Sequence, residues 1–191
     1  MDKKQLIIGI GKPGRNILSS YATTISKLYI DTDPDILELE SSLRIGEKTC
    51  GKYSSLGESA KGEFSVIESK QAILSCIQNY SEVFIVTALG GGTSSGATKR
   101  LTDLCIELNK KVQLIVGIPL ELEGGTRFRR AMDTLIYLEL IAPTTVINYN
   151  RFIPEGRFTL GKLYEEMDAI FHERLNKLLN DTDCVEDTEI T

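Results

Sequence analysis

The sequence contains no tryptophan, a single histidine (His172) and four cysteines that lie far apart. No two cysteines form a C-x-x-C pair, and one histidine cannot complete the Cys/His cluster that a structural zinc ion needs. The sequence therefore predicts no metal site. Cysteines without a pairing pattern are typical of free thiols in a reducing cytoplasm. We expect that state and that location for Cys50, Cys76, Cys105 and Cys184.

Long apolar runs and an excess of positive charge are also absent. No apolar run approaches the length of a signal-peptide core or of a membrane span. The net charge is −5, and without the five acidic residues of the last twelve positions the chain carries 22 basic and 22 acidic side chains. Such a neutral body has no basic field for nucleic acid. We expect residues 1–179 to form one domain and residues 180–191 to be a disordered acidic tail.

Short apolar runs alternate with amphipathic segments along the chain. We expect a long loop over residues 44–62, which show no clear periodicity. Near-continuous β-branched runs separated by helices indicate a doubly wound α/β domain, Rossmann-like and mainly parallel, ending in a long helix. Ligands of such sheets bind at the carboxyl ends of the strands. The expected strands are residues 6–10, 28–30, 82–88, 112–118 and 144–148, and the expected helices are residues 16–24, 67–78, 126–138 and 160–179, with another from residue 96 onward.

The first strand-to-helix junction is a glycine loop at residues 9–16. Its glycines match the G-x-G-x-x-G pattern, in which backbone N–H groups approach a phosphate at a helix N-terminus. A Walker A loop is excluded, because Arg15 and Asn16 stand where lysine and a hydroxyl residue are required. Two alternatives stay open: a tight turn without a ligand, and an NAD site with Asp31 or Asp33 as the ribose-binding acid. The glycines of this loop are Gly9, Gly11 and Gly14.

A second glycine loop, residues 90–96, follows the most apolar strand and opens a helix. Three consecutive glycines can expose successive N–H groups as a nest for phosphate oxygens. The hydroxyl residues that follow add donors and can cap the helix. An ordinary turn needs neither feature, so we expect a phosphate-binding loop rather than a hinge. Its members are Gly90, Gly91, Gly92, Thr93, Ser94, Ser95 and Gly96.

These segments together resemble the tubulin/FtsZ family. The second glycine loop resembles the family signature GGGTG(T/S)G, and the first is similar to the opening glycine loop of FtsZ. Residues 30–33, IDTD, resemble the INTD that ends the second strand there. Residues 119–124, PLELEG, are similar to the family's PFxFEG, with Arg127 in the place of the arginine that follows it. The resemblance covers residues 6–179 in order.

The resemblance also implies a guanine-nucleotide site. Asn150 matches the asparagine that contacts guanine and ribose, and Glu123 would lie at the ribose and phosphate end. Tyr164 and Asp168 fall where FtsZ carries a stacking ring and an aspartate that reads the guanine edge. Their spacing of four places both on one helix face, and a carboxylate can accept two guanine N–H groups that adenine lacks. The expected nucleotide-binding residues are Gly11, Lys12, Gly14, Arg15, Asn16, Asp33, Gly90, Gly91, Gly92, Thr93, Ser94, Ser95, Gly96, Glu123, Arg127, Asn150, Tyr164 and Asp168.

Several departures from the family pattern modify this expectation. Lys12 and Arg15 stand where FtsZ usually has glycine, and Ser94 replaces the fourth signature glycine. Residues 51–57 do not match the loop that senses the γ-phosphate. The chain ends soon after the last helix, so we expect no second domain, no FtsZ-type filaments and weak or absent GTP hydrolysis.

The leading hypothesis is a switch or adaptor that binds GTP or GDP, with Mg²⁺ accompanying GTP. A partner protein, such as FtsZ itself or a membrane-remodelling component, would read the bound state. One alternative is a nucleotide-free interaction module on the same scaffold. Another is a GTPase completed by an acid from an oligomer or a partner. An NAD-binding domain is the remaining alternative.

Overall fold

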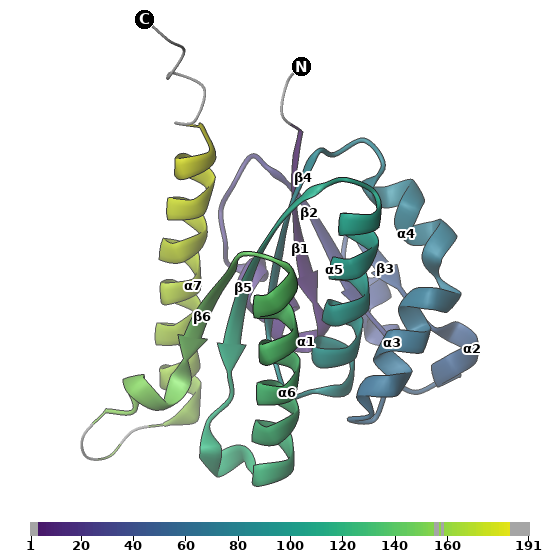
Figure 1. The fold of residues 1–191 in the computed structure, drawn as a ribbon. Coiled ribbons are helices and arrows are strands. Elements are labelled where there is room, and N and C mark those ends of the chain that lie inside the picture. The colour runs from purple at the N-terminus through teal and green to yellow at the C-terminus, as the bar shows by residue number, and fades with distance from the viewer. Residues whose placement is uncertain (1–3, 155–156, 158, 184–191) are drawn as a thin grey trace, which may run out of the picture.

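The computed structural model describes residues 4–154, 157 and 159–183, which form a parallel sheet covered by helices (Figure 1). The six strands stand in the order β3-β2-β1-β4-β5-β6, and every neighbouring pair is parallel. The doubly wound parallel sheet expected from the sequence is therefore confirmed. The strands are β1 (Gln5–Ile10), β2 (Ser26–Asp31), β3 (Ser42–Arg44), β4 (Glu82–Ala88), β5 (Lys111–Ile118) and β6 (Thr144–Asn148).

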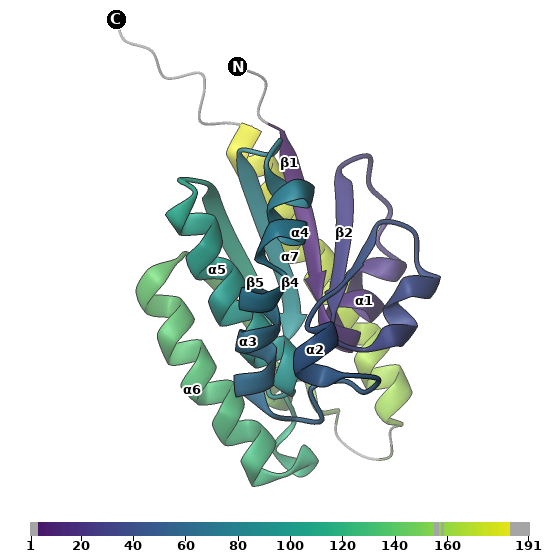
Figure 2. The ribbon, with the colours of Figure 1, turned by 90° about the vertical axis from the view of Figure 1, so that its right-hand side faces the viewer.

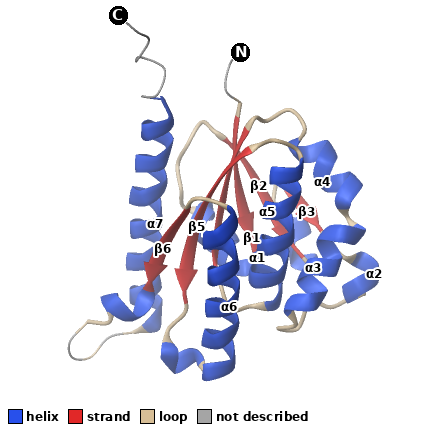
Figure 3. Cartoon of the chain, in the orientation of Figure 1, coloured by secondary structure: helices blue, strands red, loops and turns tan. Residues whose placement is uncertain are grey.

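Helices cover both faces of the sheet, as Figures 2 and 3 show. The helices are α1 (Gly11–Ser19), α2 (Glu47–Cys50), α3 (Ser59–Glu68), α4 (Lys70–Ile77), α5 (Thr98–Glu107), α6 (Gly125–Ile141) and α7 (Leu160–Asp183). One core cluster joins the sheet to α3, α4, α5 and α6, and the other joins its opposite face to α1 and α7. Since the central strands are buried on both faces, they are apolar nearly throughout, and all seven residues of β4 are buried.

The order of the strands reverses between β1 and β4. The chain proceeds from β1 to β2 and β3 on one side, and from β4 to β5 and β6 on the other. At such a switch point the following loops diverge and leave a crevice at the carboxyl edge of the sheet. The two glycine loops follow β1 and β4. The topology therefore places both loops on the same crevice, although they are far apart in the sequence.

The expectation of a long loop over residues 44–62 is wrong. This stretch contains the end of β3, the whole of α2 and the first turn of α3. The edge strand has three residues and α2 has four, so neither is long enough to show a period in the sequence. Gly62 reads as a loop residue but lies in α3, where an added Cβ would come within 2.5 Å of the Gly92 carbonyl oxygen. It is glycine because two backbone segments pass close together there.

Three helix boundaries also differ from the expected ones. The first helix begins at Gly11 rather than Asn16, because the first glycine loop itself forms its opening turn. The helix expected over residues 67–78 is two helices, α3 and α4, which meet at Ser69. The last helix continues to Asp183, beyond its expected end at Leu179. Residues 184–191 of the expected tail lie outside the described residues.

No helix in the described part of the chain is long and apolar enough to cross a membrane. Cys50, Cys76 and Cys105 are free thiols, as expected, and Cys184 lies outside the described residues.

Candidate functional site

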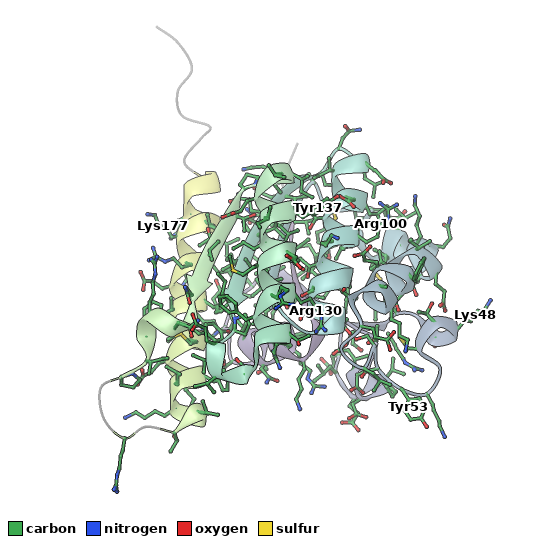
Figure 4. The ribbon with its side chains drawn as sticks, turned by 60° about the horizontal axis from the view of Figure 1, so that its bottom comes forward. Lys48, Tyr53, Arg100, Arg130, Tyr137 and Lys177 are labelled. Carbon is green, nitrogen blue, oxygen red and sulfur yellow. The ribbon has the colours of Figure 1, made fainter. Side chains whose placement is uncertain are left out.

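A cavity of about 560 Å³ opens at the carboxyl ends of the strands. Figure 4 brings this end of the molecule forward, with Arg130 of α6 near the centre and Tyr53 on the side of α2. Residues from the two glycine loops, from the end of β2 and from the segment between α2 and α3 line one part of the cavity: Gly11, Lys12, Asp31, Asp33, Ser54, Ser55, Gly57, Gly91, Gly92, Thr93 and Ser94. Residues from α1, α6 and α7 and from the turns after β5 and β6 line the other part: Asn16, Ile17, Pro119, Glu123, Arg127, Tyr149, Tyr164 and Asp168.

The first glycine loop contributes three of its expected residues to the cavity wall, namely Gly11, Lys12 and Asn16. Gly11 has a φ of +66°, a conformation that a side chain disfavours. Gly14 does not line the cavity. An added Cβ at Gly14 would lie 2.6 Å from the Val86 carbonyl oxygen, so glycine there allows α1 to pack against β4. Arg15 is also outside the cavity lining.

The second glycine loop lines the cavity with its middle residues and packs with its ends. Gly91, Gly92, Thr93 and Ser94 face the cavity, whereas Gly90, Ser95 and Gly96 are not among the lining residues. Residues 93–97 form a turn of π-helix in which every residue is buried. The loop is thus a helix start whose first residues are presented to the cavity.

Two serine hydroxyls brace this loop from within. The Gly90 N–H donates to Ser95 Oγ at 2.9 Å, and the Gly91 N–H donates to Ser94 Oγ at 3.1 Å. Ser95 was an expected phosphate contact, but its hydroxyl is fully buried and holds the glycines in place. The Arg130 guanidinium donates to the Gly90 carbonyl at 2.6 Å and ties the loop to α6.

A cluster of buried hydroxyl groups joins three segments at the same end of the cavity. Thr93 Oγ1 lies 2.7 Å from Thr32 Oγ1 and 3.0 Å from Ser55 Oγ, and the Ser55 N–H donates to Thr32 Oγ1 at 3.0 Å. The segment 54–57 therefore lines the cavity through Ser54, Ser55 and Gly57, although the sequence did not predict it. Residues 51–57 do not match the family's γ-phosphate loop, and two serines near a glycine are a pattern too common to single out.

Aromatic rings and a carboxylate form the opposite end. The Tyr164 and Tyr149 rings are 6.1 Å apart and meet edge to face, and Tyr149 also meets Phe171 at 6.4 Å. Partial burial raises the pKa of Asp168, and the nearby His172 opposes this effect. Burial likewise raises the pKa of Tyr164, with Glu123 adding to the shift. Tyr149, which the sequence did not predict as a site residue, forms the floor behind Tyr164.

Glu123, Arg127 and Asn150 organise the turns between these two ends. Arg127 Nε lies 3.2 Å from Glu123 Oε2, and the other carboxylate oxygen accepts from the Leu120 N–H at 3.0 Å. Asn150 does not line the cavity. Its Oδ1 accepts from the Glu121 N–H at 2.9 Å and its Nδ2 donates to the Pro119 carbonyl at 3.1 Å. In this structure its amide therefore joins the turns after β5 and β6.

A model of a known protein family matches most of this chain. The model described as "Tubulin/FtsZ family, GTPase domain" matches residues 4–155, which run from β1 past the turn after β6. The chain belongs to the Tubulin/FtsZ family.

Curated relatives of this Tubulin/FtsZ family member are cell division proteins. FtsZ of Rickettsia typhi is 28% identical over 176 residues, which cover 87% of this chain and 39% of the relative. FtsZ of Aquifex aeolicus is 27% identical over 174 residues, which cover 86% of this chain and 47% of the relative. The chain thus spans less than half the length of these two relatives.

Solved structures of the Tubulin/FtsZ family share the fold. FtsZ of M. jannaschii superposes with a TM-score of 0.85 and 22% identity, over 100% of this chain and 58% of that chain. CetZ2 of Haloferax volcanii superposes with a TM-score of 0.80 and 19% identity, over 97% of this chain and 60% of that chain.

In this Tubulin/FtsZ domain, Asp31 is a buried carboxyl on the cavity wall. It is 4% exposed, and its Oδ1 accepts from the N–H groups of Thr32 at 2.7 Å and Asp33 at 3.3 Å. Burial raises the pKa of Asp31 above its usual value of 3.8, and these two donors oppose the shift only in part. The native state therefore binds this proton more tightly than the unfolded state does.

Replacing Asp31 with asparagine is expected to raise the melting temperature at neutral pH. A raised native pKa means that the wild-type protein loses stability as the pH rises from about 3.8, the usual value, through the native pKa. Asparagine keeps the acceptor oxygen and removes the charge, so its advantage is absent near pH 3.8 and grows toward pH 7. Thermal melts between pH 4 and 8 measure it, with the exposed Asp35→Asn as control. A lower melting temperature at pH 7 contradicts the prediction.

Proposed function

We propose that this chain binds guanine nucleotides through the cavity at the switch point between β1 and β4. The observation that carries the proposal is the shape and chemistry of one continuous cavity. A glycine-rich helix start lies at one end, and a tyrosine ring with a carboxylate lies at the other. A nucleoside di- or triphosphate carries the complementary groups, which are an anionic chain and a planar base.

The phosphate end is suited to anions by its backbone. The first N–H groups of a helix have no partner within the helix and carry the positive end of its dipole. Gly91 and Gly92 precede such a helix start and have no side chain to obstruct a phosphate. Lys12 lies on the same wall and adds a cation. Together these groups support the binding of the α- and β-phosphates.

The base end is suited to guanine by its single carboxylate. Asp168 lies on the cavity wall one helical turn from Tyr164. An ionised carboxylate only accepts hydrogen bonds. Guanine offers N1–H and the exocyclic amino group on one edge, whereas adenine offers no such pair, so the carboxylate favours guanine. The tyrosine ring offers a face against which a purine can stack.

A nucleotide-dependent switch or adaptor role follows from the segment 54–57. Ser55 is joined to Thr93 of the second glycine loop by a 3.0 Å hydroxyl contact. The same segment displays Leu56, which is 66% exposed, and Tyr53, which precedes the segment, is 56% exposed. Through this contact, a change in phosphate occupancy at Thr93 would move the segment that carries Leu56. We propose that a protein partner reads Leu56 and Tyr53.

Magnesium would accompany the triphosphate. The described residues contain no group of three or more His, Cys, Asp or Glu side chains that could hold a metal ion. Mg²⁺ in nucleotide sites is commonly held by phosphate oxygens, water and one or two protein oxygens. The oxygen-rich phosphate end of the cavity is compatible with this mode.

Calorimetric titration of the purified chain tests the proposal. GDP and GTP are expected to bind with a Kd of about 1 µM or tighter, equivalent to about −8 kcal/mol. ATP is expected to bind at least about 100-fold more weakly, because the carboxylate then faces no N–H pair. Absence of binding of either guanine nucleotide below millimolar concentration overturns the proposal.

The alternatives give different results in the same samples. If GTP with Mg²⁺ produces no thermal shift, the scaffold is a nucleotide-free interaction module. If GTP is bound and phosphate release per chain rises with protein concentration, an oligomer completes a GTPase site. Binding of NAD without binding of GDP indicates a dinucleotide site.

A further inference from the structure

Helix α1 is joined to α7 by a histidine behind the base end of the cavity. Because α1 ends at Ser19, the carbonyl groups of its last turn have no backbone N–H of a following helical turn to accept from. His172 Nε2 lies 2.6 Å from the Ile17 carbonyl oxygen. A carbonyl oxygen only accepts, so Nε2 carries the hydrogen and donates it. This bond links two helices whose contacting residues are 155 positions apart in the chain.

This bond joins a residue of the cavity wall to a residue of α7 that lies outside the cavity lining. Ile17 lines the cavity from α1, whereas Tyr164 and Asp168 line it from α7. His172 follows Asp168 by four residues, so it lies one turn further along the same face of α7. It is near enough to Asp168 to lower the pKa of that carboxyl against the larger effect of burial. The bond between α1 and α7 therefore ties the α1 side of the cavity to the helix that carries Asp168.

We propose that His172 is a positioning residue for base recognition, holding the α1 wall at a fixed distance from Asp168. The inference rests on the proposed guanine-nucleotide function, and His172 itself lies outside the cavity lining. Base selection by a carboxylate requires the base N–H groups at about 2.7–3.2 Å from its oxygens. If the base end of the cavity widens by a fraction of that distance, it still admits a purine. The edge of the base is then no longer held against Asp168.

A second bond to α7 supplies a matched control. Tyr21 OH donates to Asn176 Oδ1 at 2.6 Å, and Asn176 lies one further turn along α7. The Tyr21 and His172 rings also contact each other, with centroids 5.0 Å apart. Neither Tyr21 nor Asn176 lines the cavity. Tyr21→Phe therefore removes a hydrogen bond between α7 and the turn after α1, without removing the one at Ile17.

The readout is the ratio of the Kd for IDP to the Kd for GDP, measured by calorimetry. Hypoxanthine lacks the exocyclic amino group of guanine, so this ratio reports the contact with Asp168 and not the phosphate end. His172→Phe and His172→Leu are expected to lower the ratio about tenfold, the value of a lost hydrogen bond. His172→Gln keeps an amide donor of similar reach and is expected to retain most of the ratio.

Thermal melts of the same variants separate positioning from simple stabilisation. Tyr21→Phe is expected to lower the melting temperature and to leave the ratio at the wild-type value. A wild-type ratio in His172→Phe and His172→Leu overturns the inference, whatever their stability. If the wild-type chain binds neither GDP nor IDP, the proposed function fails, and this inference fails with it. If the wild-type chain prefers GDP and the variants share that preference, only this inference fails.

Discussion

Asp168→Asn is expected to weaken the binding of GDP by about 100-fold, equivalent to about 2.7 kcal/mol. In the proposed site the wild-type carboxylate would accept two hydrogen bonds from the guanine edge, and charge-assisted bonds contribute about 1.5–3 kcal/mol each. An asparagine amide keeps one acceptor and turns an NH₂ group toward a second N–H donor. One bond is thus lost and a donor is left facing a donor.

The same substitution is expected to improve the binding of XDP. Xanthine carries a carbonyl in place of the exocyclic amino group of guanine, and the asparagine NH₂ group can donate to it. The GDP to XDP preference should therefore invert. Calorimetry with both nucleotides measures the change, with Glu166→Gln as control, an exposed residue of α7 outside the cavity lining. Equal GDP affinity in Asp168→Asn and the wild-type chain removes Asp168 from the site.

Gly96→Ala is expected to lower the free energy of unfolding by about 3 kcal/mol, the upper part of the range for overpacked sites. An added Cβ would lie 1.9 Å from the Ser59 carbonyl oxygen and 2.9 Å from the Glu63 backbone nitrogen. Both atoms belong to the backbone of α3, so no side chain can move aside. The direction of the change in the free energy of unfolding separates packing from helix propensity. Helix propensity alone favours alanine over glycine by about 1 kcal/mol and would raise this free energy.

Gly91→Ala is the matched control for this prediction. An added Cβ there comes closest to Ser94 Oγ, at 2.9 Å, which is the end of a side chain. We expect near wild-type stability from Gly91→Ala but weaker GDP binding, because Gly91 lines the cavity. Urea unfolding and GDP titration of both variants separate the two roles. If Gly96→Ala is as stable as the wild-type chain, α3 does not pack on the second glycine loop as described.

Most of the fold could be predicted because the apolar runs are long and regular. Strands β1, β4 and β5 are buried along nearly their whole length, so their sequences are almost continuously apolar. Such runs are typical of a parallel sheet between two layers of helices. The elements that were missed lie at residues 42–62, where the strand and the helix are too short to show a period. Their structure depends on tertiary contacts rather than on local pattern, because β3 pairs with β2 and α2 is bonded to α3 through Glu68.

The candidate site could be predicted in part, because its residues follow strands that end at one edge. Tyr164 and Asp168 were predictable as a pair from their spacing and from the family resemblance, and both line the cavity. Tyr149 and Ser55 carried no such signal, because single tyrosines and serines occur in every kind of turn. Their position on the cavity depends on which turns the fold brings together.

The sequence by itself determined that two glycine-rich turns follow two buried strands, since that pattern needs only local spacing and the absence of side chains. The tertiary structure alone decided what each glycine does. Gly91 faces the cavity, whereas an added Cβ at Gly14 or Gly96 would lie within 3 Å of neighbouring backbone, and Gly92 combines both situations. Glycine is needed where a ligand must come close to the backbone. It is also needed where a neighbouring segment of the chain lies close to the backbone. Only the position of that neighbour in space distinguishes the two cases.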